Sequence, residues 1–158
     1  MKKGIFLLFL AIFSLFIVGC TKREKMFDNG DFKIVLTEDY KEDIYKDINY
    51  YFMSNNSSVA VLKEDFELLK KVNLTSESTL EDYAKAVLRA NNKEAIIIAE
   101  ENFSYFTYNK TINTVKFFYL AAVKKGNDGF WLINFMCLDK DKDKLKDEFL
   151  KYARTIEV

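Results

Sequence analysis

The chain has 158 residues, and its 24 basic and 24 acidic side chains give a formal net charge of zero at pH 7. The two kinds of charge are interspersed, which argues against a nucleic-acid-binding protein because such proteins usually present a basic face. Histidine is absent, so catalytic centres built on imidazole and the usual imidazole-containing zinc sites are excluded. The five glycines are too scattered to form a P-loop or a dinucleotide-binding fingerprint.

Residues 1–19 have the pattern of a secretory signal peptide. Lys2 and Lys3 precede an uncharged apolar run over residues 4–18, and a charged start followed by such a run is typical of secretion signals. The run is shorter than the roughly 20 residues of a typical spanning helix, although length alone leaves an uncleaved membrane anchor open. The run leads into Ile17-Val18-Gly19-Cys20, which resembles the lipobox of bacterial lipoproteins.

The lipobox resemblance implies that the chain is cut before Cys20 and that the thiol of this residue carries a lipid. We therefore expect a lipoprotein anchored to the cell membrane on its extracytoplasmic face, since two or more acyl chains give stable attachment. Cys20–Asp31 is predicted to be the lipidated cysteine and a polar tether, and residues 32–158 are predicted to form a single domain. Cys137 then has no disulfide partner, and its apolar surroundings predict a buried, inert thiol.

The domain is predicted to contain a strand, a hairpin, a helix, several antiparallel strands and a closing helix. Thr79–Ala90 is the clearest helix, because Ser78 and Glu81 fit a capping box and apolar residues recur at helical spacing. Gly126–Gly129 is a turn signal, since Gly and Asn tolerate positive φ. The predicted strands are Phe32–Leu36, Asn49–Ser54, Ser58–Lys63, Ala95–Glu100, Phe103–Tyr108, Thr114–Lys124 and Phe130–Leu138. Helical spacing is found in Phe66–Leu74 and Asp141–Arg154. Thr155–Val158 could add a short final strand, and the pattern of Glu38–Asp47 is ambiguous. This order predicts an α+β fold in which helices pack on an antiparallel sheet.

The acidic clusters of the chain are weak candidates for chemistry. Asp139–Asp143 has acids at positions one, three and five of a calcium loop, but Lys144 and Leu150 stand where the loop needs glycine and a bidentate glutamate. The pairs Glu64-Asp65 and Glu100-Glu101 are interpreted as surface charge, because neighbours on a strand point to opposite faces. We expect no catalytic residue, no metal ion and no cofactor.

The chain is rich in aromatic residues, 16% of the total. Most are expected in the core, because aromatic side chains suit sheets and bury large areas. The run Phe103–Tyr108 places aromatic side chains on both faces of a strand, so some of them are candidates for an exposed patch that binds a partner or ligand. The sequence pattern singles out no individual binding residue.

The element order also resembles that of the PsbP-like α/β/α sandwich superfamily. The resemblance is carried by the opening strand at Phe32–Leu36, the helix around Leu80–Ala84, the strands Phe117–Val123 and Phe130–Ile133, and the helix that ends at Ala153–Ile156. It implies a non-enzymatic binding or assembly module, with an envelope protein as a possible partner and no nucleic acid. A small-ligand carrier or an envelope enzyme with an unrecognised polar site is the alternative.

Overall fold

A computed structural model describes residues 23–158 of the chain. The predicted signal peptide, the lipobox and Cys20 lie outside the described residues. Among residues 23–158, none of the helices has the length and hydrophobicity that a membrane-spanning segment requires.

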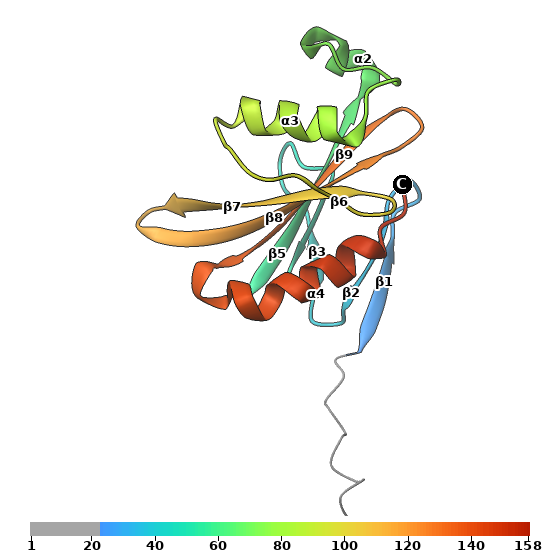
Figure 1. Cartoon of the computed structure of the whole chain (residues 1–158). Coiled ribbons are helices and arrows are strands. Elements are labelled where there is room, and N and C mark those ends of the chain that lie inside the picture. The colour runs from blue at the N-terminus through green and yellow to red at the C-terminus, as the bar shows by residue number, and fades with distance from the viewer. Residues whose placement is uncertain (1–22) are drawn as a thin grey trace, which may run out of the picture.

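A seven-stranded antiparallel sheet forms the centre of the domain, with the strand order β3-β4-β5-β9-β8-β7-β6 (Figure 1). The long strands β5, β9 and β8 lie in the middle and carry apolar residues on both faces, as expected for strands that are covered from both sides. The bounds are β3 Lys41–Asp43, β4 Tyr50–Met53, β5 Ser57–Asp65, β6 Ile98–Ala99, β7 Ser104–Ile112, β8 Val115–Lys125 and β9 Gly129–Leu138. The predicted α+β class with an antiparallel sheet is confirmed.

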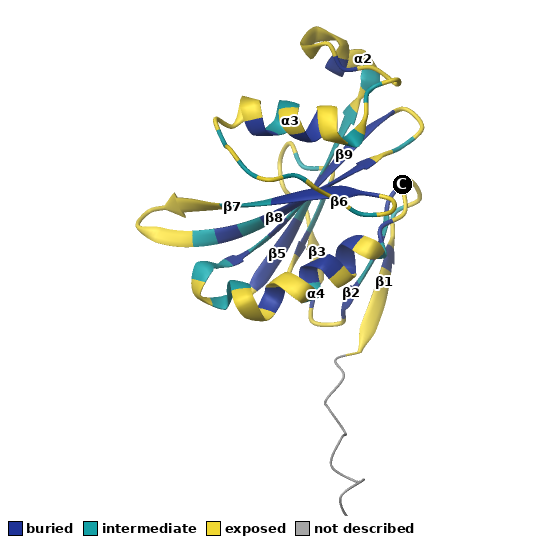
Figure 2. Cartoon of the chain, viewed as in Figure 1, coloured by how far each residue is buried: buried dark blue, intermediate teal, exposed yellow. Residues whose placement is uncertain are grey.

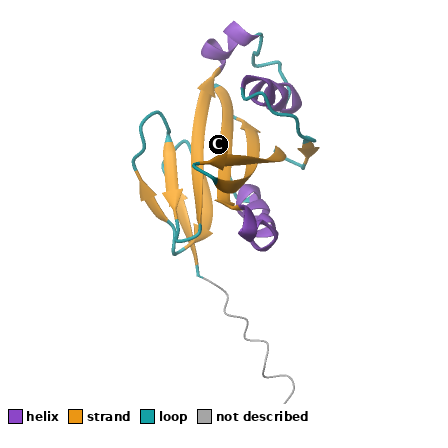
Figure 3. Ribbon diagram, turned by 90° about the vertical axis from the view of Figure 1, so that its left-hand side faces the viewer, coloured by secondary structure: helices purple, strands orange, loops and turns teal. Residues whose placement is uncertain are grey.

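Helices cover opposite faces of this sheet. The helix α4 (Lys142–Arg154) lies on one face and α3 (Leu80–Ala90) on the other, and in Figure 1 the β7–β8 hairpin lies between the two helices. Alternate residues of each strand therefore enter two separate cores. Along β9, Trp131, Ile133 and Phe135 pack with α4, whereas Phe130 and Leu132 pack with α3. In Figure 3 the short α2 (Phe66–Leu69) lies above α3, at the end of the long strand β5.

A second, two-stranded sheet joins the core beside α4. It consists of β1 (Glu24–Asp28) and β2 (Lys33–Thr37), which pair along their whole length. The prediction that residues 20–31 form a polar tether is wrong for residues 24–28, which form the strand β1. The side chain of Phe27 is buried and joins this mainly polar strand to the core. The domain therefore begins close to Cys20 rather than at Phe32.

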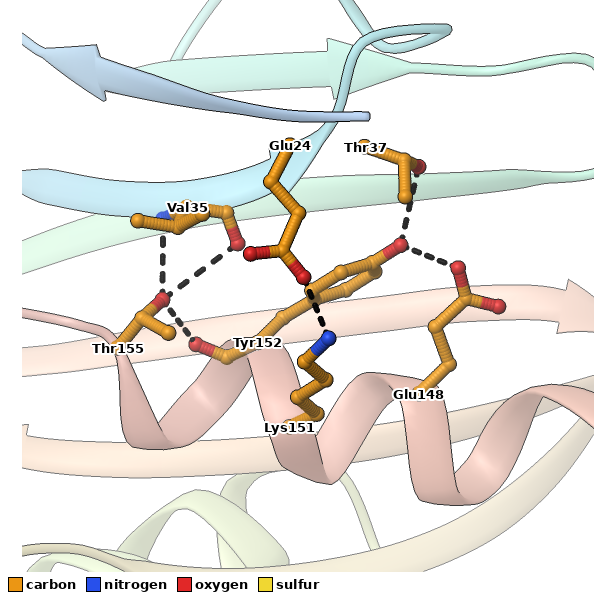
Figure 4. Close-up of polar contacts among 7 residues, drawn as sticks. All are labelled: Glu24, Val35, Thr37, Glu148, Lys151, Tyr152 and Thr155. Atoms are coloured by element: carbon orange, nitrogen blue, oxygen red, sulfur yellow. Dashed lines mark hydrogen bonds and ion pairs between the residues drawn. The ribbon is translucent and has the colours of Figure 1, made fainter. Parts of the chain in front are cut away.

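Polar contacts fasten the β1–β2 hairpin to α4 (Figure 4). The hydroxyl groups of Thr37 and Tyr152 lie 3.0 Å apart, and the Tyr152 hydroxyl also donates to Glu148. The Val35 amide donates to the Thr155 hydroxyl at 3.0 Å. Glu157 pairs with Lys33 through two backbone hydrogen bonds, so a single bridge stands where a short final strand was considered possible. The start and the end of the domain are thus held together.

Two local predictions need correction. The α3 helix has its capping box at Thr79 and Asp82, one residue later than Ser78 and Glu81. The turn at residues 126–129 is present, but neither of its glycines has a positive φ. They are required for space instead, because a Cβ at Gly126 would lie 2.8 Å from Nε1 of Trp131.

The remaining short helical elements follow the predicted positions. The segment Phe66–Leu74 contains α2 and a 3-10 turn at Lys70–Val72. The ambiguous region before the first hairpin contributes the short edge strand β3. A 3-10 turn over Asp139–Asp141 leads into α4, which ends at Arg154 as predicted.

Candidate binding surface

The sheet face that carries α3 is covered over only part of its area. The side chains under α3 are buried, whereas those farther along the same strands are half-buried or exposed. In Figure 2 the β7–β8 hairpin changes from buried near the centre to exposed at its tip. We call the uncovered part the open face; its half-buried or exposed residues are Tyr51, Met53, Ala60, Tyr108, Phe117, Tyr119, Asn134, Met136 and Leu138, and the small, buried Ser58 lies among them.

The strand register brings these residues together as neighbours. Tyr119 on β8 lies opposite Tyr108 on β7 and Met136 on β9. Met136 in turn faces Ser58, and Ser58 faces Met53 on β4. The open face is therefore one continuous row of side chains across five strands. Tyrosine and methionine are enriched at protein–protein interfaces, where they supply large and adaptable apolar contacts.

The tyrosine rings of the open face are packed against one another. Tyr108 and Tyr119 stack with their ring centroids 4.8 Å apart and their planes 3° from parallel. Tyr51 packs against Tyr45, which extends the aromatic surface into the β3–β4 loop. Burial raises the pKa of Tyr108 to about 12, and it also raises the pKa of Tyr119. Both rings are thus uncharged at neutral pH, and they remain apolar surfaces with a single polar tip.

Lysine residues border the open face. Lys110 lies opposite Phe117 in the β7–β8 register, and Lys41 lies opposite Met53 at the other edge. Lys93, in the loop after α3, places its Nζ 5.8 Å from the centre of the Tyr108 ring. No carboxylate within the described part of the chain forms an ion pair with any of these three lysines. The border is therefore suited to acidic groups on a partner.

Hollows adjoin the open face beside α3. A hollow of about 190 Å³ at the end of α3 includes Tyr108 and Asn134, so it opens onto the open face. A larger one of about 580 Å³ lies between α3 and the segment after α2. Its lining is mainly apolar, with Leu62, Leu74 and Val87 among the residues. The Tyr83 hydroxyl at its base donates to Glu64, and burial raises the pKa of Tyr83.

The acidic residues singled out from the sequence serve structural contacts. Glu64 accepts the hydrogen bond from Tyr83, and Glu100 pairs with Arg154 at 3.0 Å. Asp139 pairs with Lys116 at 3.0 Å at the start of the 3-10 turn. Among residues 23–158 no three histidine, cysteine, aspartate or glutamate side chains are grouped so that they could hold a metal ion.

Cys137 is buried in the core beside α4, as predicted. Burial, together with Asp141 and Asp139, raises the pKa of its thiol to about 11. Because the thiolate is the reactive form, the thiol has little nucleophilic character at neutral pH.

The exposed aromatic residues differ from those that the sequence favoured. Within the run Phe103–Tyr108, Phe103, Tyr105 and Phe106 are buried, and only Tyr108 reaches the open face. Phe117 and Tyr119, which lie outside that run, are half-buried on the open face. Their alternation with the buried Phe118 and Leu120 is the signal that separates the two faces of β8.

Alkaline unfolding tests the burial of the tyrosines in the core. Burial raises the pKa of Tyr40 from 10.0 to about 12, so the folded state retains a proton that the unfolded state loses between these values. The free energy of unfolding should therefore fall as the pH rises from 10 to 12. Urea unfolding followed by circular dichroism measures the slope, and Tyr40→Phe should make it shallower. The exposed Tyr45 supplies the control, because Tyr45→Phe should leave the slope unchanged.

Comparison with known proteins places the fold. No protein-family profile matches the chain, and no curated protein sequence is significantly similar to it. Solved structures do match. Cyanobacterial PsbP (CyanoP) from Synechocystis sp. PCC 6803 superposes with a TM-score of 0.52 and 10% identity, over 87% of this chain and 94% of that one. This chain has the PsbP-like α+β fold.

Two other similar structures have the same layout. The Ran-binding protein Mog1p of Saccharomyces cerevisiae has a TM-score of 0.57 and 8% identity, over 87% of this chain and 96% of that one. LpqN of Mycobacterium tuberculosis, described as involved in cell envelope biogenesis, has a TM-score of 0.53 and 10% identity, over 85% of this chain and 89% of that one. At these identities the similarity concerns the PsbP-like fold alone.

Proposed function

We propose that this protein is a lipid-anchored binding or assembly module of the cell envelope, and that its open face binds a protein partner. The observation that carries the proposal is the half-covered sheet face. On it a row of tyrosine and methionine side chains, interrupted only by the small Ser58, crosses five strands, and Phe117 lies beside this row. Contiguous apolar surface that is left partly exposed is typical of an interaction site. The proposed role is non-enzymatic.

The anchoring part of the proposal rests on the sequence before the domain. The lipobox-like segment ends at Cys20, and the first strand begins at Glu24. Two of the proteins with a similar fold support the general role, since one is named for binding another protein and the other for envelope biogenesis.

Site-specific photo-crosslinking tests the binding role in the cells that produce the protein. A benzophenone amino acid in place of Phe117 should crosslink the full-length chain to an envelope protein. The same group in place of Leu68, which is 62% exposed on α2, is the matched control and should give no such product. Tyr119→Lys in the Phe117 photoprobe chain should abolish the product, because it places a charge in the middle of the open face. Equal crosslinking from both positions, or products that survive Tyr119→Lys, would contradict a role for this face.

The hollow of about 580 Å³ beside α3 favours a second candidate function, the carriage of a small apolar ligand. Its volume falls within the range of small-molecule pockets. Native mass spectrometry of the purified full-length chain would distinguish the two functions. A bound small molecule that is lost on Val87→Trp would favour carriage, whereas a ligand-free protein whose partner crosslinks survive Val87→Trp would favour the binding module.

A further inference from the structure

The outer edge of β7 has backbone groups that no other strand uses. The neighbouring strand β6 pairs only with Ser104 and Tyr105, whereas β7 continues to Ile112. The β7–β8 turn consists of Asn113 and Thr114, both with positive φ, as in a two-residue type I′ hairpin. In such a hairpin Ile112 and Val115 exchange hydrogen bonds with each other, and the bonding direction alternates along the strand.

This alternation decides which backbone groups of β7 point outward. Thr107, Asn109 and Thr111 direct their N–H and C=O groups away from β8. Their only hydrogen-bond contact within residues 23–158 is from Lys93 Nζ to the Asn109 carbonyl, at a long distance of 3.5 Å. The free donors and acceptors therefore recur at every second residue, which is the spacing that another extended polypeptide matches.

The two edges of the sheet differ in how they are protected. At the far edge, β3 is three residues long, and all three are charged. Short and charged edge strands discourage pairing with another chain. The free edge of β7, Thr107–Ile112, is twice as long and contains a single charged residue, Lys110. On this edge, Tyr108 belongs to the open face and Lys110 borders it.

We propose that β7 accepts an extended segment of the partner protein as an added strand. This inference rests on the proposed function and specifies how the partner binds. The added strand would lie about 4.8 Å from β7, and every second side chain would project over the open face beside Tyr108. Lys93 and Lys110 have no carboxylate partner among residues 23–158. They favour a segment with acidic residues among its apolar ones.

Random dodecapeptides displayed on phage are the probe, selected against the full-length chain in detergent. The selected peptides should alternate apolar and polar residues and contain aspartate or glutamate. A synthetic copy of the strongest peptide is then measured by fluorescence anisotropy. Thr111→Pro should weaken its binding about tenfold or more, because proline removes one outward N–H, and a lost hydrogen bond of about 1.4 kcal/mol corresponds to that factor.

The matched control is Thr111→Ala, which changes the same side chain but keeps the outward N–H and should bind like the parent. Proline at an outward-facing edge position does not interrupt the pairing with β8. Amide hydrogen exchange on the unaltered protein supplies a measurement that needs no variant. The bound peptide should slow exchange at Thr107, Asn109 and Thr111, and it should leave Lys110, which already bonds to β8, unchanged.

Two outcomes would overturn strand addition. In the first, the peptides bind and Tyr119→Lys abolishes binding, but neither Thr111→Pro nor amide exchange at the edge responds. The partner then docks on the open face alone, and the proposed function stands without the added strand. In the second, no peptide binds more tightly than about 100 µM. In that case strand addition fails, whereas the crosslinking experiment still decides the proposed function.

Discussion

Replacement of Trp131 by alanine should lower the free energy of unfolding by about 3–5 kcal/mol, the usual cost of removing a large aromatic residue from a core. Trp131 is 1% exposed and lies on β9, in the middle of the sheet. Its ring stacks with Phe32 at 5.5 Å and with Tyr50 at 6.5 Å between centroids. The cavity left by alanine would therefore lie between the central sheet and Phe32, which precedes β2 in the β1–β2 hairpin.

Urea unfolding followed by far-ultraviolet circular dichroism measures this loss, since Trp131 is the only tryptophan and its fluorescence disappears with it. The matched control is Phe117→Ala on the open face, which should cost about 1 kcal/mol or less because that ring is already partly in water. An equal cost at the two positions would show that Phe117 belongs to the core, and it would remove the physical basis of the open face.

Cys20→Ala should abolish incorporation of labelled palmitate and leave an unprocessed precursor. The physical reason is that only a thiol at this position can form the thioether to the lipid, and alanine has no nucleophile. Metabolic labelling followed by gel electrophoresis measures both effects. Because anchoring depends on acyl chains, the protein should also lose its lipid-dependent partition into detergent.

The other cysteine provides the control for lipidation. Cys137→Ala should retain the label, since Cys137 is buried in the core and has no access to lipid-processing enzymes. The Cys137→Ala variant tests whether Cys20 is the lipidated residue, because it removes a thiol from a different position in the chain. Palmitate labelling that persists in Cys20→Ala would refute the lipoprotein proposal, whereas labelling lost in both variants would point to a general defect in export.

The central sheet and the two long helices could be predicted from the sequence because their patterns are local. The apolar runs of β8 and β9 and the helical spacing of apolar residues in α3 can each be recognised within one continuous segment of sequence. The first strand could not, since Glu24–Asp28 is polar apart from Met26 and Phe27. Its place in the fold depends on Phe27 reaching a core built mainly from residues distant in the sequence, and no local pattern records that contact.

The open face could be predicted only in part, because it depends on the length of the helix relative to the strands that it covers. A strand with apolar residues on both faces looks the same whether its second face is covered or not. The helix α3 has 11 residues and spans about 16 Å, whereas β8, also with 11 residues, spans about 36 Å. A helix of this length cannot cover such a strand, and Phe117 lies on the part of β8 that is left open.

The early start of β1 has a consequence for where the protein can act. Only three residues lie between Cys20 and Glu24, and four extended peptide units reach at most about 14 Å. If Cys20 carries the proposed lipid, the domain is therefore held against the bilayer surface, and its β1 end must face the headgroups. The search for a partner then becomes a two-dimensional one, restricted to molecules that share the same membrane or lie directly above it.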